Sequence, residues 1–259
     1  LSKAESFNFT SLDTKSFKGK NIFGKIISLI YLEINLIKSI FIIKKIKPDV
    51  VFSTGGYVTL APALASYILS IPLFIHEQNS IPGLVNRILN RLSKLTFEAF
   101  PGSFNESSKI HTVGNPVRSE IIMKPVSEAS MKERFNILIL GGSQGSKQLN
   151  EIVLKAFKDK TIPSYWRIVH QTGDLDKSSV VDIYSKQSFS YEVVSYIEDI
   201  GRAYHESDLV VGRSGAMTVS EICCSSKPSI LFPLPWAADN HQYFNAKFLE
   251  DKKASILLE

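Results

Sequence analysis

The feature that most constrains this chain is a short apolar run that passes through two glycines into a helical pattern. Residues 209–211 (Leu-Val-Val) have the character of a buried parallel strand, and Gly212 and Gly215 precede the helical pattern that continues to Cys224. A strand, a tight turn and an uncapped helix start aim several backbone N–H groups at one point, with the positive end of the helix dipole behind them. Such a point attracts a phosphate or diphosphate without a metal.

Glu221 lies farther along the same helical pattern. Its carboxylate can accept two hydrogen bonds from adjacent hydroxyls, as a ribose offers. Together with the glycine turn it predicts a nucleotide site. The alternative is a β–α turn that needs its glycines only for a positive φ angle, and this stretch alone does not decide between the two.

A second strand, glycine loop and helix lie upstream. Residues 135–140 predict a strand, 141–147 (Gly-Gly-Ser-Gln-Gly-Ser-Lys) a loop and 148–157 a helix. The loop matches neither the P-loop nor the dinucleotide fingerprint. Two helix starts on one sheet can nevertheless converge on one ligand, so the pair favours a shared nucleotide site over two ordinary turns.

Composition narrows the class of protein. Of the 259 residues, 44% are hydrophobic and 21% charged, as in a folded protein with room for two domains. The net charge is +5, without a Lys/Arg tract interleaved with aromatic residues. The only cysteines, Cys223 and Cys224, are adjacent and have no zinc-ligand spacing. We expect a protein of the reducing cytosol with no nucleic-acid partner, no metal site and no signal peptide.

The first half also alternates strands and helices. Residues 49–53, 72–75 and 95–97 predict strands, which implies a parallel sheet with right-handed crossovers. His76 and Glu77 would follow the second strand, at the edge where ligands bind in such sheets. They form either an acid/base pair or a hydrogen-bonded scaffold. The polar segment 124–134 indicates a connector, and we divide the chain into domains 1–118 and 119–259.

Residues Ile22–Ile46 are largely aliphatic. Glu33 and Lys38 near the middle argue against a membrane span, because each central charge costs about 2.5–3.5 kcal/mol. We expect a helix mostly buried against a sheet, whose outer face rests on an anionic membrane through flanking lysines. The polar residues that form a stripe at helical spacing are Ser28, Tyr31, Asn35 and Lys38.

Several motifs together carry a family resemblance. In order, they are GGYVTLAP, IHEQNSIPGLVNR, AFPG, VGNPVR, ILGGSQGSKQLNE, YIEDI, GRSGAMTVSE and DNHQYFNA. They resemble the MurG family of N-acetylglucosaminyltransferases. The resemblance implies a GT-B fold, which is two Rossmann-like α/β domains facing a cleft. It also implies inverting transfer of GlcNAc from UDP-GlcNAc to undecaprenyl-linked lipid I, which yields lipid II in peptidoglycan synthesis. No cofactor is implied, because UDP-GlcNAc is a substrate.

The resemblance also implies site residues. Ile197 would contact the uracil, Glu221 the ribose and Gln242 the GlcNAc hydroxyls. The diphosphate turn would comprise Ala216, Met217, Thr218, Val219 and Ser220. Asn79, Arg118 and Ser143 would complete the substrate site, and His76 and Glu77 are the candidate catalytic residues. By the same resemblance the chain would lie peripherally on the cytoplasmic face of the inner membrane, with other cell-wall synthesis proteins as partners.

Departures from the family pattern leave alternatives open. The family begins with a strand and a glycine-rich loop ending in His and closes with helices, neither of which this sequence contains. His241 stands where some members have Gln. The alternatives are a truncated UDP-sugar-binding module without turnover, and a GT-B transferase with another lipid acceptor.

Overall fold

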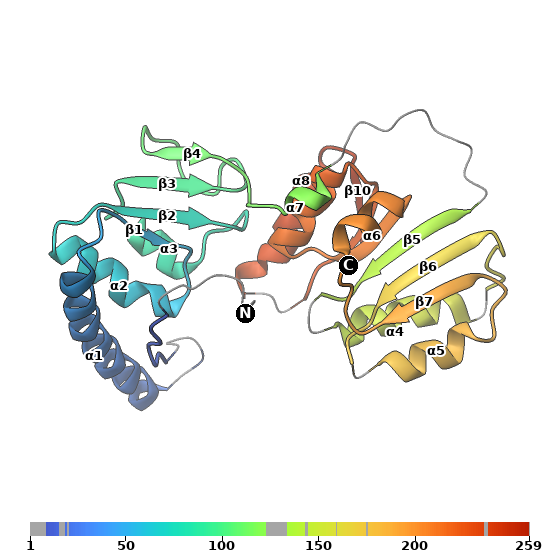
Figure 1. Ribbon diagram of the computed structural model, residues 1–259, viewed down its shortest axis with the longest axis horizontal. Coiled ribbons are helices and arrows are strands. Elements are labelled where there is room, and N and C mark those ends of the chain that lie inside the picture. Colours follow the sequence, from blue (N-terminus) through green and yellow to red (C-terminus); the bar gives the residue numbers. More distant parts are fainter. Residues whose placement is uncertain are drawn as a thin grey trace. The chain divides into compact units, whose positions relative to one another are not determined.

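A computed structural model describes residues 9–15, 19, 21–122, 134–142, 145–158, 160–174, 176–235 and 238–258. The chain divides into two α/β units (Figure 1). The first comprises Leu1–Gln78 with Pro82–Val113, and the second comprises Asn79–Ile81 with Gly114–Glu259.

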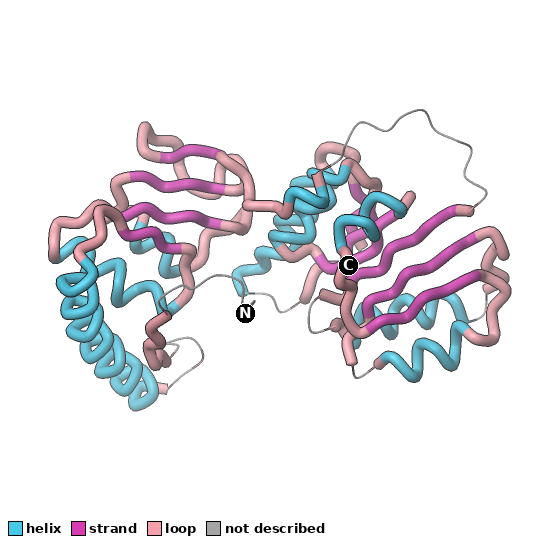
Figure 2. The backbone as a smooth tube through the Cα atoms, viewed as in Figure 1, coloured by secondary structure: helices cyan, strands magenta, loops and turns pink. Residues whose placement is uncertain are grey.

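The described part of the first unit holds one parallel sheet of four strands in the order β1-β2-β3-β4. Its strands are β1 (Val51–Ser53), β2 (Leu73–Glu77), β3 (Leu95–Glu98) and β4 (Ile110–Thr112). Helix α2 (Tyr57–Ile68) packs on β1 and β2, and α3 (Leu84–Leu89) packs on β2 (Figure 2). β4 is not predicted from the sequence, because its three residues carry a single aliphatic side chain.

Helix α1 (Ile22–Ile46) begins at its N-cap Asn21, whose side chain accepts a hydrogen bond from the Gly24 N–H, and ends at Lys47 in the left-handed conformation. It packs on α2. By length and composition it could cross a membrane. Only 22% of its most apolar 18-residue window is buried inside the protein. The prediction of a helix mostly buried against a sheet is therefore wrong.

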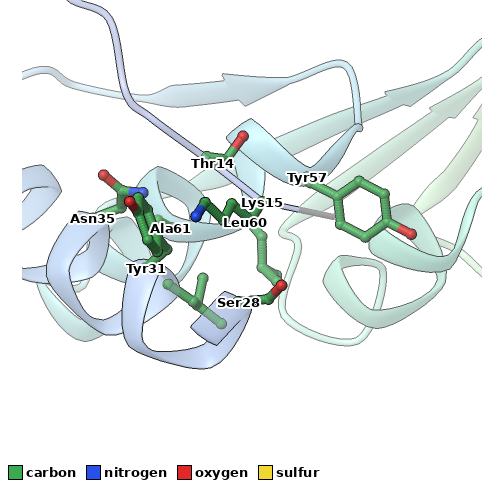
Figure 3. A pocket seen from close by; sticks show the side chains of 9 residues that line it. Thr14, Lys15, Ser28, Tyr31, Asn35, Tyr57, Leu60 and Ala61 are labelled. Carbon is green, nitrogen blue, oxygen red and sulfur yellow. The ribbon is translucent and has the colours of Figure 1, made fainter. Parts of the chain in front are cut away.

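Of the polar stripe of α1, Ser28, Tyr31 and Asn35 face inward and Lys38 is exposed. Leu32 and Ile43 also face inward, while most other apolar side chains of the helix are exposed. Ser28 and Asn35 are buried, and Asn35 Nδ2 donates to the Asp13 carbonyl oxygen at 2.7 Å. The Lys15 ammonium lies 4.5 Å from the Tyr31 ring centroid. Figure 3 shows these polar side chains gathered against α2 around a pocket of only about 10 Å³. Short polar groups can be buried here because each finds a partner close by. The exposed apolar residues are Ile22, Phe23, Ile26, Ile27, Leu29, Ile30, Ile34, Ile37, Phe41 and Ile46.

Among its described residues, the second unit holds a parallel sheet of six strands in the order β10-β9-β8-β5-β6-β7. The strands are β5 (Phe135–Leu140), β6 (Trp166–Gln171), β7 (Ser190–Val194), β8 (Leu209–Arg213), β9 (Ser229–Phe232) and β10 (Ser255–Leu257). The helices are α4 (Lys147–Lys158), α5 (Lys177–Tyr184), α6 (Ile200–Glu206), α7 (Ala216–Ser225) and α8 (His241–Glu250). Read from β7, this is the strand order of the Rossmann fold, with its topological switch between β5 and β8.

Residues 114–122 belong to the second unit. Asn115 Nδ2 donates to Ser220 Oγ at 2.9 Å, and His205 Nε2 lies 2.8 Å from the Glu120 carbonyl oxygen. The short helix η1 (Ser119–Ile121) packs on α6. The division therefore falls after Val113, whereas the sequence suggested a boundary after residue 118.

Asp239 is a plausible N-cap by sequence, but the N-cap position is taken by Asn240. Both residues have φ angles of 54°, so the chain enters α8 through two left-handed residues. A left-handed residue cannot place its side chain as an extended N-cap residue does.

Gly201→Ala tests the docking of η1 on α6. In a helix this change ordinarily stabilises by about 0.5–1 kcal/mol. Here the added Cβ would lie 2.7 Å from Glu120 Cβ and from its carbonyl oxygen. We expect the unfolding free energy in urea to fall by about 1–3 kcal/mol. Gly83→Ala is the control for adding a methyl group without a clash, because its Cβ would meet nothing within 4 Å. Since Gly83 is the N-cap of α3, we expect a loss there too, but a smaller one. An unchanged or raised stability of Gly201→Ala would contradict the packing.

Candidate functional site

The turn between β8 and α7 does not use its glycines for a positive φ angle. Neither Gly212 nor Gly215 is among the residues with positive φ, and Gly215 has φ −62°. Gly212 is instead closely packed, because a Cβ there would lie 3.3 Å from the Leu140 carbonyl oxygen. The N-cap Gly215 provides no side chain, so the first N–H groups of α7 have no capping acceptor from it. The positive-φ alternative is thus wrong for this turn.

In the turn between β5 and α4, glycines serve both for a positive φ angle and for close packing. Gly142 and Gly145 have φ angles of 87° and 78°. A Cβ on Gly145 would overlap the Thr172 carbonyl oxygen, and one on Gly141 would lie 2.8 Å from the Gln171 carbonyl oxygen. The loop therefore folds back tightly onto the end of β6. Ser143, a predicted substrate-binding residue, lies outside the described residues.

Arg213 joins the two turns. It ends β8, and its Nη1 donates to Ser146 Oγ at the start of α4 at 2.6 Å. Its Nε is buried without a hydrogen-bond partner among the described residues, and so is Ser214 Oγ beside it. Burial lowers the pKa of the guanidinium. A half-buried guanidinium with a buried, unused Nε donor and a buried hydroxyl are groups that an anionic ligand would satisfy.

A cavity of about 510 Å³ opens where the two turns meet. Its volume is in the range of small-molecule sites. Gln242 reaches it from α8, and its Oε1 accepts a hydrogen bond from the Leu234 N–H at 2.9 Å. The residues that line the cavity are Gly141, Gly142, Gly145, Ser146, Lys147, Gln148, Arg213, Gly215, Thr218, Leu234 and Gln242.

The α7 residues predicted for the diphosphate turn divide into two groups. Ala216, Met217 and Thr218 form the exposed or half-exposed first turn, and Thr218 lines the cavity. Val219 is buried in the core, and its N–H donates to the Gly215 carbonyl oxygen within the helix. Ser220 Oγ is bonded within its own unit, to the Ala216 carbonyl oxygen at 2.9 Å. The first three residues are therefore better placed for a ligand than the last two.

Glu221 is held by a buried phenol. Tyr204 is fully buried, and its hydroxyl donates to Glu221 Oε2 at 3.1 Å. Burial raises the pKa of Glu221, while the Tyr204 hydrogen bond and the Arg118 charge act in the opposite direction. Arg118, an exposed N-cap of η1, thus acts on the carboxylate predicted to bind ribose. The hydrogen bond orients the carboxylate and leaves Oε1 for a ligand.

His76 and Glu77 lie inside β2 and are buried. Glu77 Oε2 accepts from Asn86 Nδ2 at 2.8 Å and from the Gly83 N–H at 3.1 Å. His76 Nδ1 lies 3.2 Å from Gln78 Nε2. These bonds tie β2 to the start of α3, which fits the scaffold alternative for Glu77. Within the described ranges, no group of three or more His, Cys, Asp or Glu is arranged to hold a metal ion.

Asn79 is linked to the β8–α7 turn through Asn245. Asn245 is fully buried, its Nδ2 donates to Asn79 Oδ1 and to the Ser214 carbonyl oxygen, and its Oδ1 accepts from the Ser80 N–H at 2.9 Å. Ile197, half-buried after β7, donates its N–H to Gln171 Oε1 at 3.2 Å. Sequence reasoning did not single out Asn245, Gln171, Arg213 or Tyr204. The sequence signal that could have indicated them is a polar residue within an otherwise apolar strand or helix face.

Comparisons with known proteins agree on one family. Residues 1–97 match the glycosyltransferase family 28 N-terminal domain, and residues 136–259 match the glycosyltransferase family 28 C-terminal domain. The UDP-N-acetylglucosamine--N-acetylmuramyl-(pentapeptide) pyrophosphoryl-undecaprenol N-acetylglucosamine transferase of Coxiella burnetii (strain RSA 493 / Nine Mile phase I) is 38% identical over 261 residues, or 98% of this chain and 72% of the relative. The chain belongs to the MurG family.

Other MurG proteins agree. The transferase of the same name from Nitrosospira multiformis is 38% identical over 263 residues, which cover 100% of this chain and 73% of the relative. The crystal structure of Acinetobacter baumannii MurG has a TM-score of 0.77 and 35% identity, covering 89% of this chain and 65% of that chain. The chain thus spans about two thirds of that MurG structure. The predicted GT-B fold, with two parallel-sheet α/β domains, is confirmed.

Glu221→Gln should stabilise the protein at neutral and higher pH. Because burial raises the pKa of Glu221 in the folded state, this residue favours folding at low pH and that contribution is lost as the pH rises through its pKa. A Gln side chain can still accept the Tyr204 hydrogen bond and carries no charge. We expect a higher unfolding free energy in urea than wild type at pH 8, with the difference shrinking at pH 4.

Asp182→Asn is the control, because it neutralises a carboxylate of the second unit that is exposed. An equal gain in that variant, or a Glu221→Gln protein less stable than wild type at pH 8, would contradict the burial argument.

Proposed function

We propose that this chain is an inverting glycosyltransferase that moves GlcNAc from UDP-GlcNAc to undecaprenyl-linked lipid I, forming lipid II for peptidoglycan synthesis. The observation that carries the proposal is the cavity at the β5–β8 switch point, where two glycine turns meet the half-buried Arg213. The names of the relatives supply the donor and the acceptor.

In this proposal, each part of UDP-GlcNAc contacts a different group of residues in the second unit. The diphosphate lies in the cavity against the N-terminal turn of α7 and Arg213, where helix-end N–H groups and a cation favour an anion. The ribose hydroxyls bind the Glu221 carboxylate. The uracil lies against the loop at Ile197, and Gln242 holds the GlcNAc hydroxyls. Arg118 and Asn79 flank the site.

The proposed reaction depends on stabilising the negative charge that develops on the diphosphate leaving group. The bond between the GlcNAc anomeric carbon and the β-phosphate oxygen breaks as the acceptor hydroxyl oxygen attacks from the opposite face, which inverts the anomeric centre. The diphosphate gains negative charge in this step, and preorganised N–H donors and Arg213 stabilise it. We propose that no metal or cofactor is needed. A base must accept the hydroxyl proton, and His76 and Glu77 are the candidates from the first unit.

The decisive experiment is transfer of radiolabelled GlcNAc to a lipid I analogue, with release of UDP measured in parallel. Transfer to lipid I supports the proposal. UDP-GlcNAc binding without transfer supports the alternative of a sugar-nucleotide-binding module. Transfer only to diacylglycerol supports the alternative of another lipid acceptor.

Glu221→Ala should weaken UDP-GlcNAc binding about tenfold or more, because a hydrogen bond to a charged group contributes about 1.5–3 kcal/mol. Isothermal titration calorimetry measures the Kd directly. Asp182→Ala removes an exposed carboxylate from α5 and is expected to leave the Kd unchanged. An unaltered Kd in Glu221→Ala would refute the ribose role.

The first unit supports peripheral attachment to the cytoplasmic face of the membrane. The exposed side of α1 is apolar over most of its length, and Lys25, Lys44 and Lys45 are exposed at its two ends. Apolar side chains can enter the acyl boundary while lysines contact anionic headgroups. Because Ser28 and Asn35 on the buried side of α1 are hydrogen-bonded within the protein, the helix lies on the bilayer in this proposal and does not span it. Other cell-wall synthesis proteins are proposed as neighbours there.

Ile37→Asp should reduce binding to vesicles containing anionic lipid. Ile37 is 57% exposed on α1, and a buried Ile side chain contributes about 1.5–3 kcal/mol. We expect about a tenfold lower partition coefficient in vesicle sedimentation. Ile152→Asp is the matched control, since Ile152 is also an exposed helical isoleucine but lies on α4. Equal loss in both variants would refute docking through α1.

A further inference from the structure

The carboxyl end of β6 carries a buried polar run that the proposed mechanism does not use. β6 lies between β5, which leads into the glycine turn, and β7, which leads into the loop of Ile197. His170, Gln171 and Thr172 are each at most 5% exposed. Buried polar side chains remain in a strand only where they find partners, so their partners indicate what the run does.

Gln171 uses both ends of its amide. Its Nε2 donates to the Gly142 carbonyl oxygen at 2.7 Å, and its Oε1 accepts from the Ile197 N–H at 3.2 Å. The same Gly142 oxygen also accepts from the Gly145 N–H at 3.0 Å. One buried side chain thereby bridges the loop at the diphosphate cavity and the loop proposed for the base. A buried side chain with fixed rotamers holds such a distance more tightly than two independent loops would.

We propose that Gln171 is a positioning residue that sets the spacing between the base loop and the diphosphate turn, and so makes the site select a pyrimidine nucleoside diphosphate over a purine one. This inference rests on the proposed function. The distance from the diphosphate to the far edge of the base is shorter in a pyrimidine nucleotide than in a purine one. A bridge of fixed length therefore favours one of them and leaves the chemistry at the sugar untouched.

The residues beside Gln171 hold this end of β6 in place. His170 Nδ1 lies 2.9 Å from the Tyr184 hydroxyl, and His170 Nε2 lies 3.1 Å from Asn150 Oδ1. Asn150 Nδ2 in turn donates to the Thr172 carbonyl oxygen at 3.0 Å. Burial lowers the pKa of His170 to about 4, so the ring is neutral near pH 7 and the network keeps one arrangement. Gln171 is thus anchored from a rigid strand end.

The test compares UDP and ADP binding by calorimetry in wild type and in Gln171→Met, which has a similar volume and neither hydrogen-bonding end. We expect the Kd for UDP to rise about tenfold and the Kd for ADP to change less than about threefold, so that the preference for UDP falls. In transfer assays the KM for UDP-GlcNAc should rise with kcat within about twofold, because the bridge does not touch the reacting atoms.

Gln187→Met is the matched control. Gln187 Nε2 also donates to a backbone carbonyl of the second unit, that of Phe157 at 3.4 Å, but it lies before β7 begins, at the other end of the sheet. Its nucleotide preference should equal that of wild type. An unchanged preference in Gln171→Met, or an equal fall in Gln187→Met, would overturn the positioning role.

If circular dichroism shows that Gln171→Met does not fold, Gln171→Glu takes its place. Its carboxylate keeps the acceptor for the Ile197 N–H and loses the donor to Gly142, so the preference for UDP should again fall, and an unaltered preference would overturn the inference. Wild-type protein that binds no UDP would refute the proposed function itself. Wild-type protein that prefers UDP, with variants that keep that preference, would refute only the role of Gln171.

Discussion

The parallel pairing of β5 with β8 is the constraint on which the proposed nucleotide site depends. In this register Leu140 pairs with Gly212, so the last residue of β5 adjoins the residue where the second glycine turn begins. The next residue, Arg213, then reaches Ser146 at the start of α4. Strands far apart in the sequence thus place two helix N-termini beside one cation, at the switch point where open α/β sheets bind ligands. No single motif of the chain could do this.

Much of this arrangement could be predicted from the sequence. The strand at Phe135–Leu140, the strand at Ser229–Phe232 and the helix at Ile22–Ile46 follow from apolar runs bounded by glycine, proline or charge. Strand order could not be derived that way, because periodicity reports which residues are buried and not which strands are neighbours. Gln171 and Tyr204 were missed for a related reason: their importance lies in partners 26 and 17 residues away.

Helix α1 shows where hydrophobicity misleads. An aliphatic helix with a narrow polar stripe is ordinarily read as apolar side inward. Here Ser28 and Asn35 are buried beside the apolar Leu32 and Ile43, and Asn35 donates to the Asp13 carbonyl oxygen. That partner precedes the helix in the sequence, so the residue pattern within the helix does not show that Asn35 is buried. The exposed apolar side of α1 fits the proposed contact with a membrane surface.

The proposed donor site is assembled from groups that a stability-optimised sequence would not keep. Arg213 Nε and Ser214 Oγ are buried without partners among the described residues, and a buried unsatisfied polar group costs about 1–3 kcal/mol. Glu221 is a partly buried carboxylate whose pKa is raised by that burial. The core of the second unit, from Ile137 to Phe189, offsets such costs. A diphosphate and a ribose would form hydrogen bonds with these same atoms. The groups that reduce the stability of the free protein are therefore the groups that would contribute binding energy.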